Sequence, residues 1–446
     1  MNGKIGMISL GCAKNQVNAE QMLYLLQQAG YEILPSPAGA DVVIVNTCGF
    51  IESAKQEAID RILAMGALKQ EGRIGKLLVT GCLSQRYQKE ILTELPEVDG
   101  VLGTGNYADI VQSVRDVTEG KTVCRFASVN DARIDGVERV LTTPEHYAYL
   151  KIAEGCDNHC AYCVIPSLRG KFRSRPMEAL VEEARLLAQS GVKELIVVAQ
   201  DTCRYGLDLY GKRRLAPLLR ELCRIDGFRW IRVHYLYPDE IDDELIETIA
   251  SEEKIVKYLD IPIQHIHDGI LKTMHRRGGG AEIRALIEKL RRRIPGLVLR
   301  TSLITGLPGE GEKEFTELCV FLKEYRLERV GAFAFSPEEG TPAAEMEHPD
   351  QETAVRRAEL ISELQAEIMD EQGAERIGEV TEVLCDGYSE EDGCFVGRTY
   401  ADSPDIDGKV LLRSEKPLAP GMFVQVLIDD VCDGDLSGLV VEVREK

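Results

Sequence analysis

The sequence predicts an α/β protein built in three parts. These are an N-terminal doubly wound parallel sheet, a central partial (β/α)6 barrel and a small C-terminal antiparallel β-barrel. Three observations lead to this prediction. The chain of 446 residues is too long for one hydrophobic core. Up to about residue 373, apolar strand-like runs alternate with stretches of helical periodicity. Beyond that point, short alternating segments are separated by Gly, Pro and Asp turns.

The first 130 residues carry the pattern of a parallel sheet. Residues 4–10, 41–46 and 76–80 are apolar runs typical of buried strands. A helical pattern follows each run, from about Val17 to Ala29 with a stop at Gly30, from Glu52 onward, and after Ser84. Strands that alternate with helices in this way form a parallel sheet covered on both faces.

A second strand–helix series is expected over residues 145–373, after a linker at 131–144. Six strands are predicted, at 147–153, 194–199, 230–235, 257–262, 297–304 and 329–335. Six units are fewer than the eight of a closed (β/α)8 barrel, so we expect an open barrel. A charged helix is predicted over 350–372, ending at Gly373.

Residues 374–446 are predicted to form an all-β module. Strands are expected at Glu379–Leu384, Val410–Leu412, Met422–Ile428 and Leu439–Val443. Segments this short, with turns between them, favour a small barrel.

Composition restricts the compartment and the class of partner. The N-terminus lacks a signal-peptide pattern and no apolar run approaches the roughly 20 residues of a membrane span, which predicts a cytoplasmic protein without a membrane partner. Thirteen cysteines in such a chain favour metal or redox use over disulfides. A formal net charge of −21 argues against a polyanionic partner held mainly by its phosphates.

Three cysteines lie close together directly after the first barrel strand, in a Cys-x₃-Cys-x₂-Cys arrangement: Cys156, Cys160 and Cys163. Three thiolates can hold three corners of a [4Fe–4S] cluster, whereas ordinary ferredoxin clusters use four. One iron then keeps an open site for a chelating amino acid group. The alternative is a structural zinc site with His159 or a distant cysteine as fourth ligand.

Three further cysteines occupy equivalent positions in the N-terminal part. Cys12, Cys48 and Cys82 each follow a predicted strand and precede its helix. These turns share one edge of a parallel sheet, the edge at which open α/β folds bind ligands. We therefore expect the three thiols to converge on a second metal site. The alternative, buried thiols that act as small hydrophobes, is our interpretation of the other seven cysteines, which are Cys124, Cys203, Cys223, Cys319, Cys385, Cys394 and Cys432.

Together these features resemble the radical S-adenosylmethionine (SAM) methylthiotransferase family over essentially the whole chain. The resemblance implies two [4Fe–4S] clusters, held by Cys12, Cys48 and Cys82 and by the catalytic Cys156, Cys160 and Cys163. It implies two SAM molecules per turnover. One methylates sulfur at the N-terminal cluster, and the other yields a radical that abstracts hydrogen from the acceptor carbon. It also implies an external electron donor and a C-terminal TRAM domain of OB-like fold.

Four residues are candidates for SAM contact through the same resemblance. Tyr162 would pack against the adenine, which is compatible with a place in the core. Gly306 and Glu310 lie in a glycine-rich turn after the fifth barrel strand, which could instead be only a tight turn. Gln200 ends the second strand, where the alternative is a helix N-cap by Asp201 or Thr202.

The family divides into enzymes that modify tRNA adenosines and enzymes that modify an aspartate β-carbon of a small-subunit ribosomal protein. Residues 374–446 contain 17 acidic and 7 basic residues, which suits a basic ribosomal protein or the ribosome better than tRNA. Segments 258–265, 335–342 and 403–408 also resemble the aspartate branch. The alternatives are a tRNA methylthiotransferase and a non-catalytic iron–sulfur or zinc scaffold that binds the ribosome.

Overall fold

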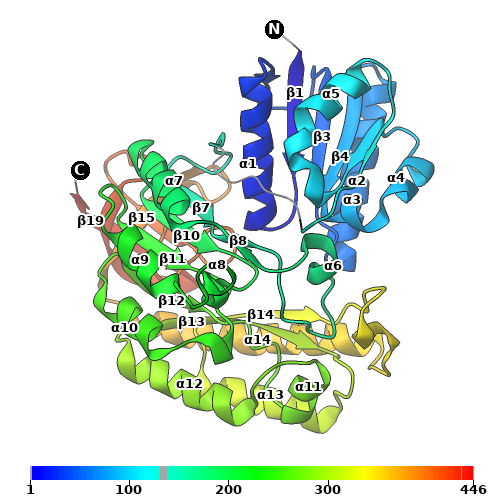
Figure 1. Cartoon of the computed structure of the whole chain (residues 1–446). Coiled ribbons are helices and arrows are strands. Elements are labelled where there is room, and N and C mark those ends of the chain that lie inside the picture. The colour runs from blue at the N-terminus through cyan, green and yellow to red at the C-terminus, as the bar shows by residue number, and fades with distance from the viewer. Residues whose placement is uncertain (1–2, 131–137, 433, 445–446) are drawn as a thin grey trace.

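The computed structural model describes residues 3–130, 138–432 and 434–444. Figure 1 shows the blue and cyan N-terminal sheet standing above the green and yellow central strands and helices, with the C-terminal strands behind β7, β10 and β11. Each of the three predicted parts has its own sheet, and two of these sheets are open and six-stranded while the third is closed. The predicted fold class is confirmed.

The N-terminal sheet is parallel throughout, in the order β2-β1-β3-β4-β5-β6. Separate apolar cores lie on its two faces, one containing Met22 of α1 and the other Ile62 of α2, so the sheet is doubly wound. Its strands are β1 (Lys4–Ser9), β2 (Glu32–Ile33), β3 (Val42–Thr47), β4 (Lys76–Gly81), β5 (Gly100–Leu102) and β6 (Val123–Arg125). Its helices are α1 (Ala13–Gln28), α2 (Glu52–Gln70), α3 (Cys82–Tyr87), α4 (Lys89–Glu94) and α5 (Ile110–Thr118).

The central sheet has the six predicted strands, all parallel, in the order β14-β13-β12-β11-β10-β7. They are β7 (Tyr147–Lys151), β10 (Glu194–Val198), β11 (Trp230–Val233), β12 (Ile255–Asp260), β13 (Val298–Thr305) and β14 (Arg329–Ala334). A small hairpin of β8 (Ala153–Glu154) and β9 (Arg173–Ser174) frames the cysteine triplet. The helices are α6 (Ile165–Arg169), α7 (Met177–Gln189), α8 (Leu207–Tyr210), α9 (Leu215–Cys223), α10 (Asp243–Ser251), α11 (Asp268–Thr273), α12 (Gly280–Arg293), α13 (Glu312–Tyr325) and α14 (Gln351–Glu375).

The C-terminal strands close into a barrel, in the order β15-β16-β17-β19-β18. The strands are β15 (Val380–Ser389), β16 (Cys394–Arg398), β17 (Val410–Arg413), β18 (Phe423–Cys432) and β19 (Asp435–Arg444). The sequence did not predict β16, whose five residues include a glycine and an arginine. One pair, β17 with β19, is parallel, so the barrel is antiparallel except at this seam.

Three helix boundaries differ from the predictions. Helix α3 begins at Cys82 rather than after Ser84, so this cysteine is part of the helix and does not precede it. Helix α1 begins at Ala13, directly after Cys12, rather than near Val17. Helix α14 does not end at Gly373 but continues to Glu375. Gly373 is needed there for close packing, because a Cβ built on it would stand 2.5 Å from a side-chain carbon of Val431 in β18.

The segment between β16 and β17 enters the central barrel. Asp405 accepts a hydrogen bond from the Tyr147 hydroxyl (3.0 Å), and Asp407 accepts one from the Tyr258 hydroxyl (2.6 Å). Both tyrosines are buried residues of barrel strands. The C-terminal barrel therefore covers the central barrel at the end opposite to the cysteine triplet.

The predicted linker falls partly on residues 131–137, which lie outside the described residues. The part that follows packs on α1, where Arg139 forms an ion pair of 2.9 Å with the buried Glu20. Within the described ranges, no helix is both long and apolar enough to cross a membrane.

Candidate active site

The turns that carry the three N-terminal cysteines lie against one another. Cys12 immediately precedes α1, Cys48 follows β3, and Cys82 is the first residue of α3. A Cβ built on Gly11 would stand 3.0 Å from Sγ of Cys48, and one built on Gly49 would stand 3.0 Å from the carbonyl carbon of Cys82. Glycine at both positions lets these backbones approach closely.

Two buried cations lie beside this N-terminal triad. Lys14 and Arg169 are 7% and 3% exposed. Burial acts to raise the pKa of the Cys12 thiol, but the two cations and the backbone N–H groups of Asn15 and Lys14 together outweigh it, and the pKa lies below its ordinary value. Burial and the neighbouring thiols of Cys82 and Cys12 raise the pKa of Cys48 to about 12. The positive charges of Lys14 and Arg169 favour the thiolate form of a neighbouring cysteine, and the thiolate is the form that binds iron.

Arg169 reaches this triad from the central part of the chain. It is the last residue of α6, and its Nε and Nη2 donate to Sγ of Cys82 at 3.3 and 3.2 Å. The same guanidinium donates to Oδ1 of Asn18 and to Oδ1 of Asn15, each at 2.9 Å, and lies 3.5 Å from Oε2 of Glu154. All five N–H groups are therefore directed at acceptors.

The central triplet lies in the loop between β8 and α6. The backbone N–H of Asn158 donates to Sγ of Cys156 at 3.4 Å. Burial, with the Asp201 carboxylate and the Cys160 thiol adding to it, raises the pKa of Cys156 to about 11. Sγ of Cys160 lies 3.9 Å from the Tyr237 hydroxyl and 3.8 Å from Nη1 of Arg276.

Each set offers three thiols, the donor type that a [4Fe–4S] cluster uses. Burial and the thiols of Cys82 and Cys12 raise the pKa of Cys48, and burial with the thiols of Cys160 and Cys156 raises the pKa of Cys163. The cysteines of both sets are free thiols. Among the described residues, no three His, Cys, Asp or Glu side chains are arranged to hold one metal ion. Thiolates around a four-iron cluster bind different irons and stand further apart than the ligands of a single ion.

The four candidates for SAM contact fall in two places. Tyr162 is in a small apolar core with Leu307 and Phe335, which Cys160 and Cys163 border. The side-chain amide of Gln200 donates to Oε1 of Glu154 at 3.0 Å. Glu154 lies two residues before Cys156 in the sequence. Tyr162 and Gln200 adjoin the triplet.

Gly306 and Glu310 contact each other. The Gly306 N–H donates to the Glu310 carboxylate at 2.8 Å, and Arg357 of α14 pairs with the same carboxylate at 2.9 Å. Asp201 caps a short 3₁₀ helix by accepting from the Cys203 N–H at 3.2 Å, as one of the alternatives for this segment predicted.

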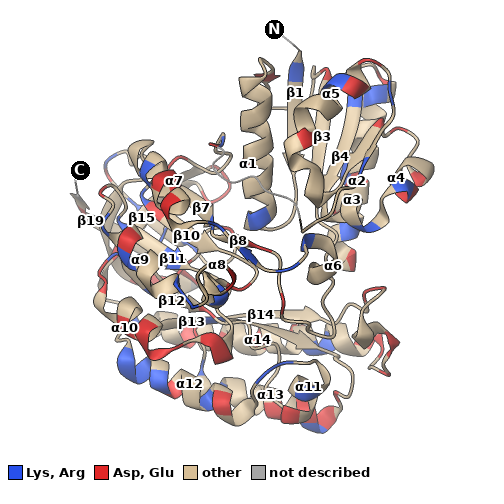
Figure 2. Ribbon diagram, viewed as in Figure 1, with Lys and Arg blue, Asp and Glu red and all other residues tan. Residues whose placement is uncertain are grey.

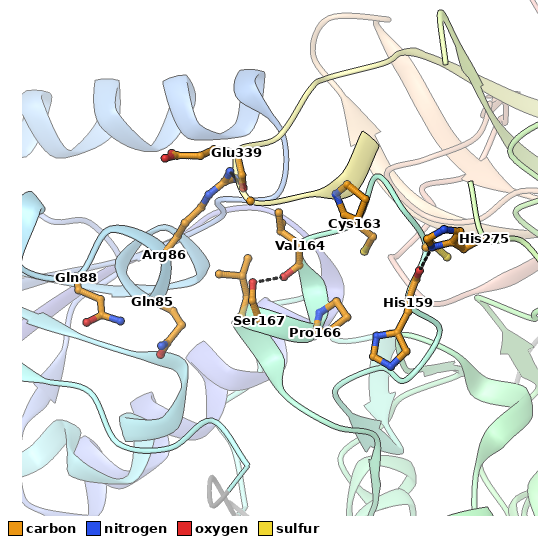
Figure 3. Close-up of a pocket in the computed structure, with 14 residues that line it drawn as sticks. Gln85, Arg86, Gln88, His159, Cys163, Val164, Pro166, Ser167, His275 and Glu339 are labelled. Atoms are coloured by element: carbon orange, nitrogen blue, oxygen red, sulfur yellow. Dashed lines mark hydrogen bonds between the residues drawn. The ribbon is translucent and has the colours of Figure 1, made fainter. Parts of the chain in front are cut away.

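A cavity of about 630 Å³ opens beside the triplet, between α3 and the central part. Figure 3 shows Gln85 and Arg86 on one side, His159 and His275 on the other, and Cys163 and Val164 between them. The carbonyl of His159 lies 3.3 Å from Nδ1 of His275. Because Cys160 and Cys163 line it, this cavity gives access to the triplet from solvent.

The sequence did not predict the roles of Lys14, Glu154 and Arg169. A signal was present for Arg169, which comes six residues after the third cysteine of the triplet. Its contact with Cys82, 87 residues away, depends on how the two sheets dock, and a linear pattern does not contain that information.

Three family models match the chain. They are "Uncharacterized protein family UPF0004" over residues 4–103, the Radical SAM superfamily over 150–322 and the TRAM domain over 377–441. Among solved structures, the radical SAM methyltransferase TsrM from Kitasatospora setae superimposes with a TM-score of 0.59. It covers 88% of this chain and 80% of its own at 13% identity, so it shows a shared fold.

Curated relatives match over nearly their full length. A protein of Thermoanaerobacter sp. (strain X514) is 48% identical over 97% of this chain and 99% of its own. One of Caldanaerobacter subterraneus subsp. tengcongensis is 50% identical over the same shares. Both carry the name "Ribosomal protein uS12 methylthiotransferase RimO".

The matched radical SAM domain and the cysteine triplet within it define the class, a radical SAM enzyme that uses a [4Fe–4S] cluster and SAM. The match over the whole length then gives the family. The chain belongs to the radical SAM methylthiotransferases, in the family of the RimO proteins.

Proposed function

We propose that this chain transfers a methylthio group to the β-carbon of an aspartate in ribosomal protein uS12. Its relatives at 48–50% identity are named for methylthiotransfer to that protein. The single observation that carries the proposal is the presence of two cysteine triads on either side of one short helix, α6, with Arg169 spanning the gap. An enzyme that joins a sulfur to a carbon needs both a sulfur site and a radical source close together.

The six cysteines are the proposed ligands of two [4Fe–4S] clusters. Cys12, Cys48 and Cys82 would hold the N-terminal auxiliary cluster, and Cys156, Cys160 and Cys163 the radical cluster. When bound at the triplet, the cluster supplies the electron that cleaves the sulfonium of SAM. The buried Tyr162 shields one side of the triplet from water.

Four further residues are the proposed SAM contacts. Tyr162 and Gln200 adjoin the triplet and would orient the bound SAM. Gly306 and Glu310 would act from the turn after β13. The three functional units of the proposal are residues 1–130 for the auxiliary cluster, 145–373 for radical chemistry and 374–446 for the substrate, joined by a linker at 131–144.

Charge supports a basic protein as the acceptor. In the view of Figure 2, both acidic and basic residues occur on α7, α9 and α12. The 17 acidic residues of 374–446 include Asp386, Asp402, Asp405 and Asp407, which bind groups of the central part or of the barrel itself. Other acids of this part also form ion pairs, Glu382 with Arg229 and Asp392 with Lys409, so the acidic surplus that a basic partner meets is smaller than the count. We place the reaction in the cytoplasm, where ribosomes assemble, with an external protein as electron donor.

Iron counting tests the two-cluster proposal. Anaerobically reconstituted chain is expected to hold about eight irons. Changing Cys156, Cys160 and Cys163 to Ala should leave about half of that iron and abolish SAM cleavage. The matched control is Cys124→Ala, which removes an exposed thiol of β6 and should change neither the iron content nor SAM cleavage. A chain that binds one zinc and never cleaves SAM would overturn the proposal in favour of a scaffold.

Mass spectrometry tests the acceptor. In a deletion strain, uS12 should lose the methylthio group on its aspartate while tRNA nucleosides stay unchanged, and the intact gene should restore it. Loss of a methylthio group from tRNA alone would show that the acceptor is an adenosine.

A further inference from the structure

Helix α6 lies between the two cysteine triads. It begins two residues after Cys163 and ends at Arg169. On its apolar side, Val164 and Leu168 form a small core with Cys82, and Phe50 packs against it. The carbonyl of Leu168 accepts a hydrogen bond of 2.6 Å from Thr104, which docks the helix on the N-terminal part.

The guanidinium of Arg169 is fully committed by this docking. Two of its five N–H groups are directed at Cys82, and the others are directed at Asn15, Asn18 and Glu154. Asn15 is itself held by donation to the backbone carbonyl of Leu10 at 2.8 Å. At 3% exposure, the charge is poorly screened by solvent.

Glu154 partly balances this charge from the other side. Its carboxylate lies 2.9 Å from Lys151 and 3.5 Å from Arg169. It precedes Cys156, the first cysteine of the triplet, by two residues along the chain, and its contact with Arg169 continues to Cys82. Glu154, Arg169 and Cys82 are each at least four-fifths buried.

From this geometry we propose that Arg169 is the positioning residue that sets the reduction potential of the auxiliary cluster and ties that cluster to the radical triplet. Hydrogen bonds to cluster sulfurs and nearby positive charge stabilise the reduced, more negative core, and therefore raise its potential. The redox step concerned is the uptake of one electron by the oxidised cluster from an added reductant. Arg169 shifts its equilibrium and is not consumed.

The inference rests on the proposed auxiliary cluster and is tested on that cluster alone. A chain with Cys156, Cys160 and Cys163 changed to Ala is reconstituted and titrated with dithionite, with the reduced cluster followed by electron paramagnetic resonance. Relative to this background, Arg169→Met should shift the midpoint to a more negative potential. Arg169→Lys keeps the charge and should restore part of the shift.

A variant of opposite sign separates electrostatics from loss of structure. Glu154→Gln removes the balancing carboxylate without touching Cys82, and it should shift the midpoint to a more positive potential. Glu154→Gln also tests the electrostatic effect if the Arg169→Met variant fails to bind iron. The control is Arg173→Gln, whose side chain donates to the backbone carbonyls of Lys171 and Arg169 and which should leave the potential unchanged.

The outcomes separate this inference from the proposed function. If the background chain binds no iron, the auxiliary cluster and the proposed function fail together. If it binds about four irons but neither Arg169→Met nor Glu154→Gln moves the potential, only the role of Arg169 is overturned. Shifts of the same sign in both variants would also overturn it, because a general structural disturbance would then explain them.

Discussion

Glu338 accepts a hydrogen bond of 2.5 Å from Nη1 of Arg86 and joins the central part of the chain to the N-terminal sheet. Glu338 lies in the loop after β14, whereas Arg86 belongs to α3. Lys55 of α2 approaches the same carboxylate at 3.1 Å. With only 2% of its side chain exposed, Glu338 is a buried anion held by two cations. Arg86 also lines the cavity beside the triplet, so this contact fixes one wall of the access path.

Glu338→Gln should lower the free energy of unfolding by about 3 kcal/mol, because it leaves the mostly buried Arg86 without its anion and Lys55 with only the exposed Glu52. Urea denaturation of the apoprotein measures the change. The control is Glu52→Gln, whose carboxylate also pairs with Lys55 but is 73% exposed, and which should cost at most about 0.5 kcal/mol. Equal losses in the two variants would contradict the role given to Glu338.

A second buried carboxylate anchors the C-terminal barrel. Glu194, at the start of β10, binds Nε of Arg232 at 2.7 Å and Nη1 of Arg398 in β16 at 2.6 Å. Glu194→Gln should cost about 3–5 kcal/mol, since the buried Arg232 loses its charge partner and the buried Arg398 keeps only Asp386. The control is Glu382→Gln, which disrupts a pair with the half-exposed Arg229 across the same boundary and should cost at most about 1 kcal/mol. Thermal unfolding of both variants tests this difference, and a smaller loss for Glu194→Gln would refute it.

The contacts of the C-terminal barrel show why charge counting was incomplete. The sequence resemblance at 403–408 pointed to the aspartate branch, and the structure places Asp405 and Asp407 of this segment on tyrosines inside the central barrel. Their charge therefore serves internal packing. A count of acidic residues cannot separate such buried partners from acids that face a substrate.

The strands and the cysteine turns were predictable for a physical reason. A buried parallel strand is a continuous apolar run, and every βα turn of such a sheet falls on one edge, so Cys12, Cys48 and Cys82 could be grouped from local patterns. The antiparallel strand β16 was missed because its five residues, which include a glycine and an arginine, do not alternate clearly between apolar and polar. The contact of Arg169 with Cys82 was missed because it depends on the docking of two separately folded sheets.

His234 should make stability depend on pH. Burial, with Arg232 and Arg300 in support and Asp260 opposed, lowers the pKa of His234 to about 3. Between this value and the ordinary value of about 6.5, the unfolded chain binds the proton and the folded chain does not. The stabilisation is therefore complete above about pH 6.5 and is lost as the pH falls.

From pH 7 to pH 5, His234 alone should account for a loss of about 2 kcal/mol. His234→Gln keeps a polar group facing Ser403, which lies 3.1 Å from Nε2, but does not titrate. Urea denaturation at both pH values should show a smaller loss for this variant than for the natural chain. Parallel pH profiles would mean that His234 is not the responsible group.

Gly155 positions the cysteine triplet through its backbone. It has a φ of 77°, and a Cβ built on it would stand 2.1 Å from the carbonyl oxygen of Lys171 and 2.5 Å from that of Gly170. The same Gly170 carbonyl accepts the N–H of Cys156 at 3.1 Å. An added methyl group therefore meets rigid backbone at the point where the first ligand of the triplet is held.

Gly155→Ala should destabilise the chain by about 3 kcal/mol or more and reduce bound iron to about half, since the displaced Cys156 no longer faces Cys160 and Cys163. Gly120→Ala is the matched control. Gly120 has a φ of 83° but open space around its Cβ position, so only the backbone strain of about 1–2 kcal/mol is expected, with full iron content. Thermal unfolding and iron analysis of the two variants decide the matter. If both variants melt at the same temperature and hold equal iron, a small backbone shift relieves the contact with Lys171. Glycine is then needed at position 155 only for its positive φ, and the positioning role is wrong.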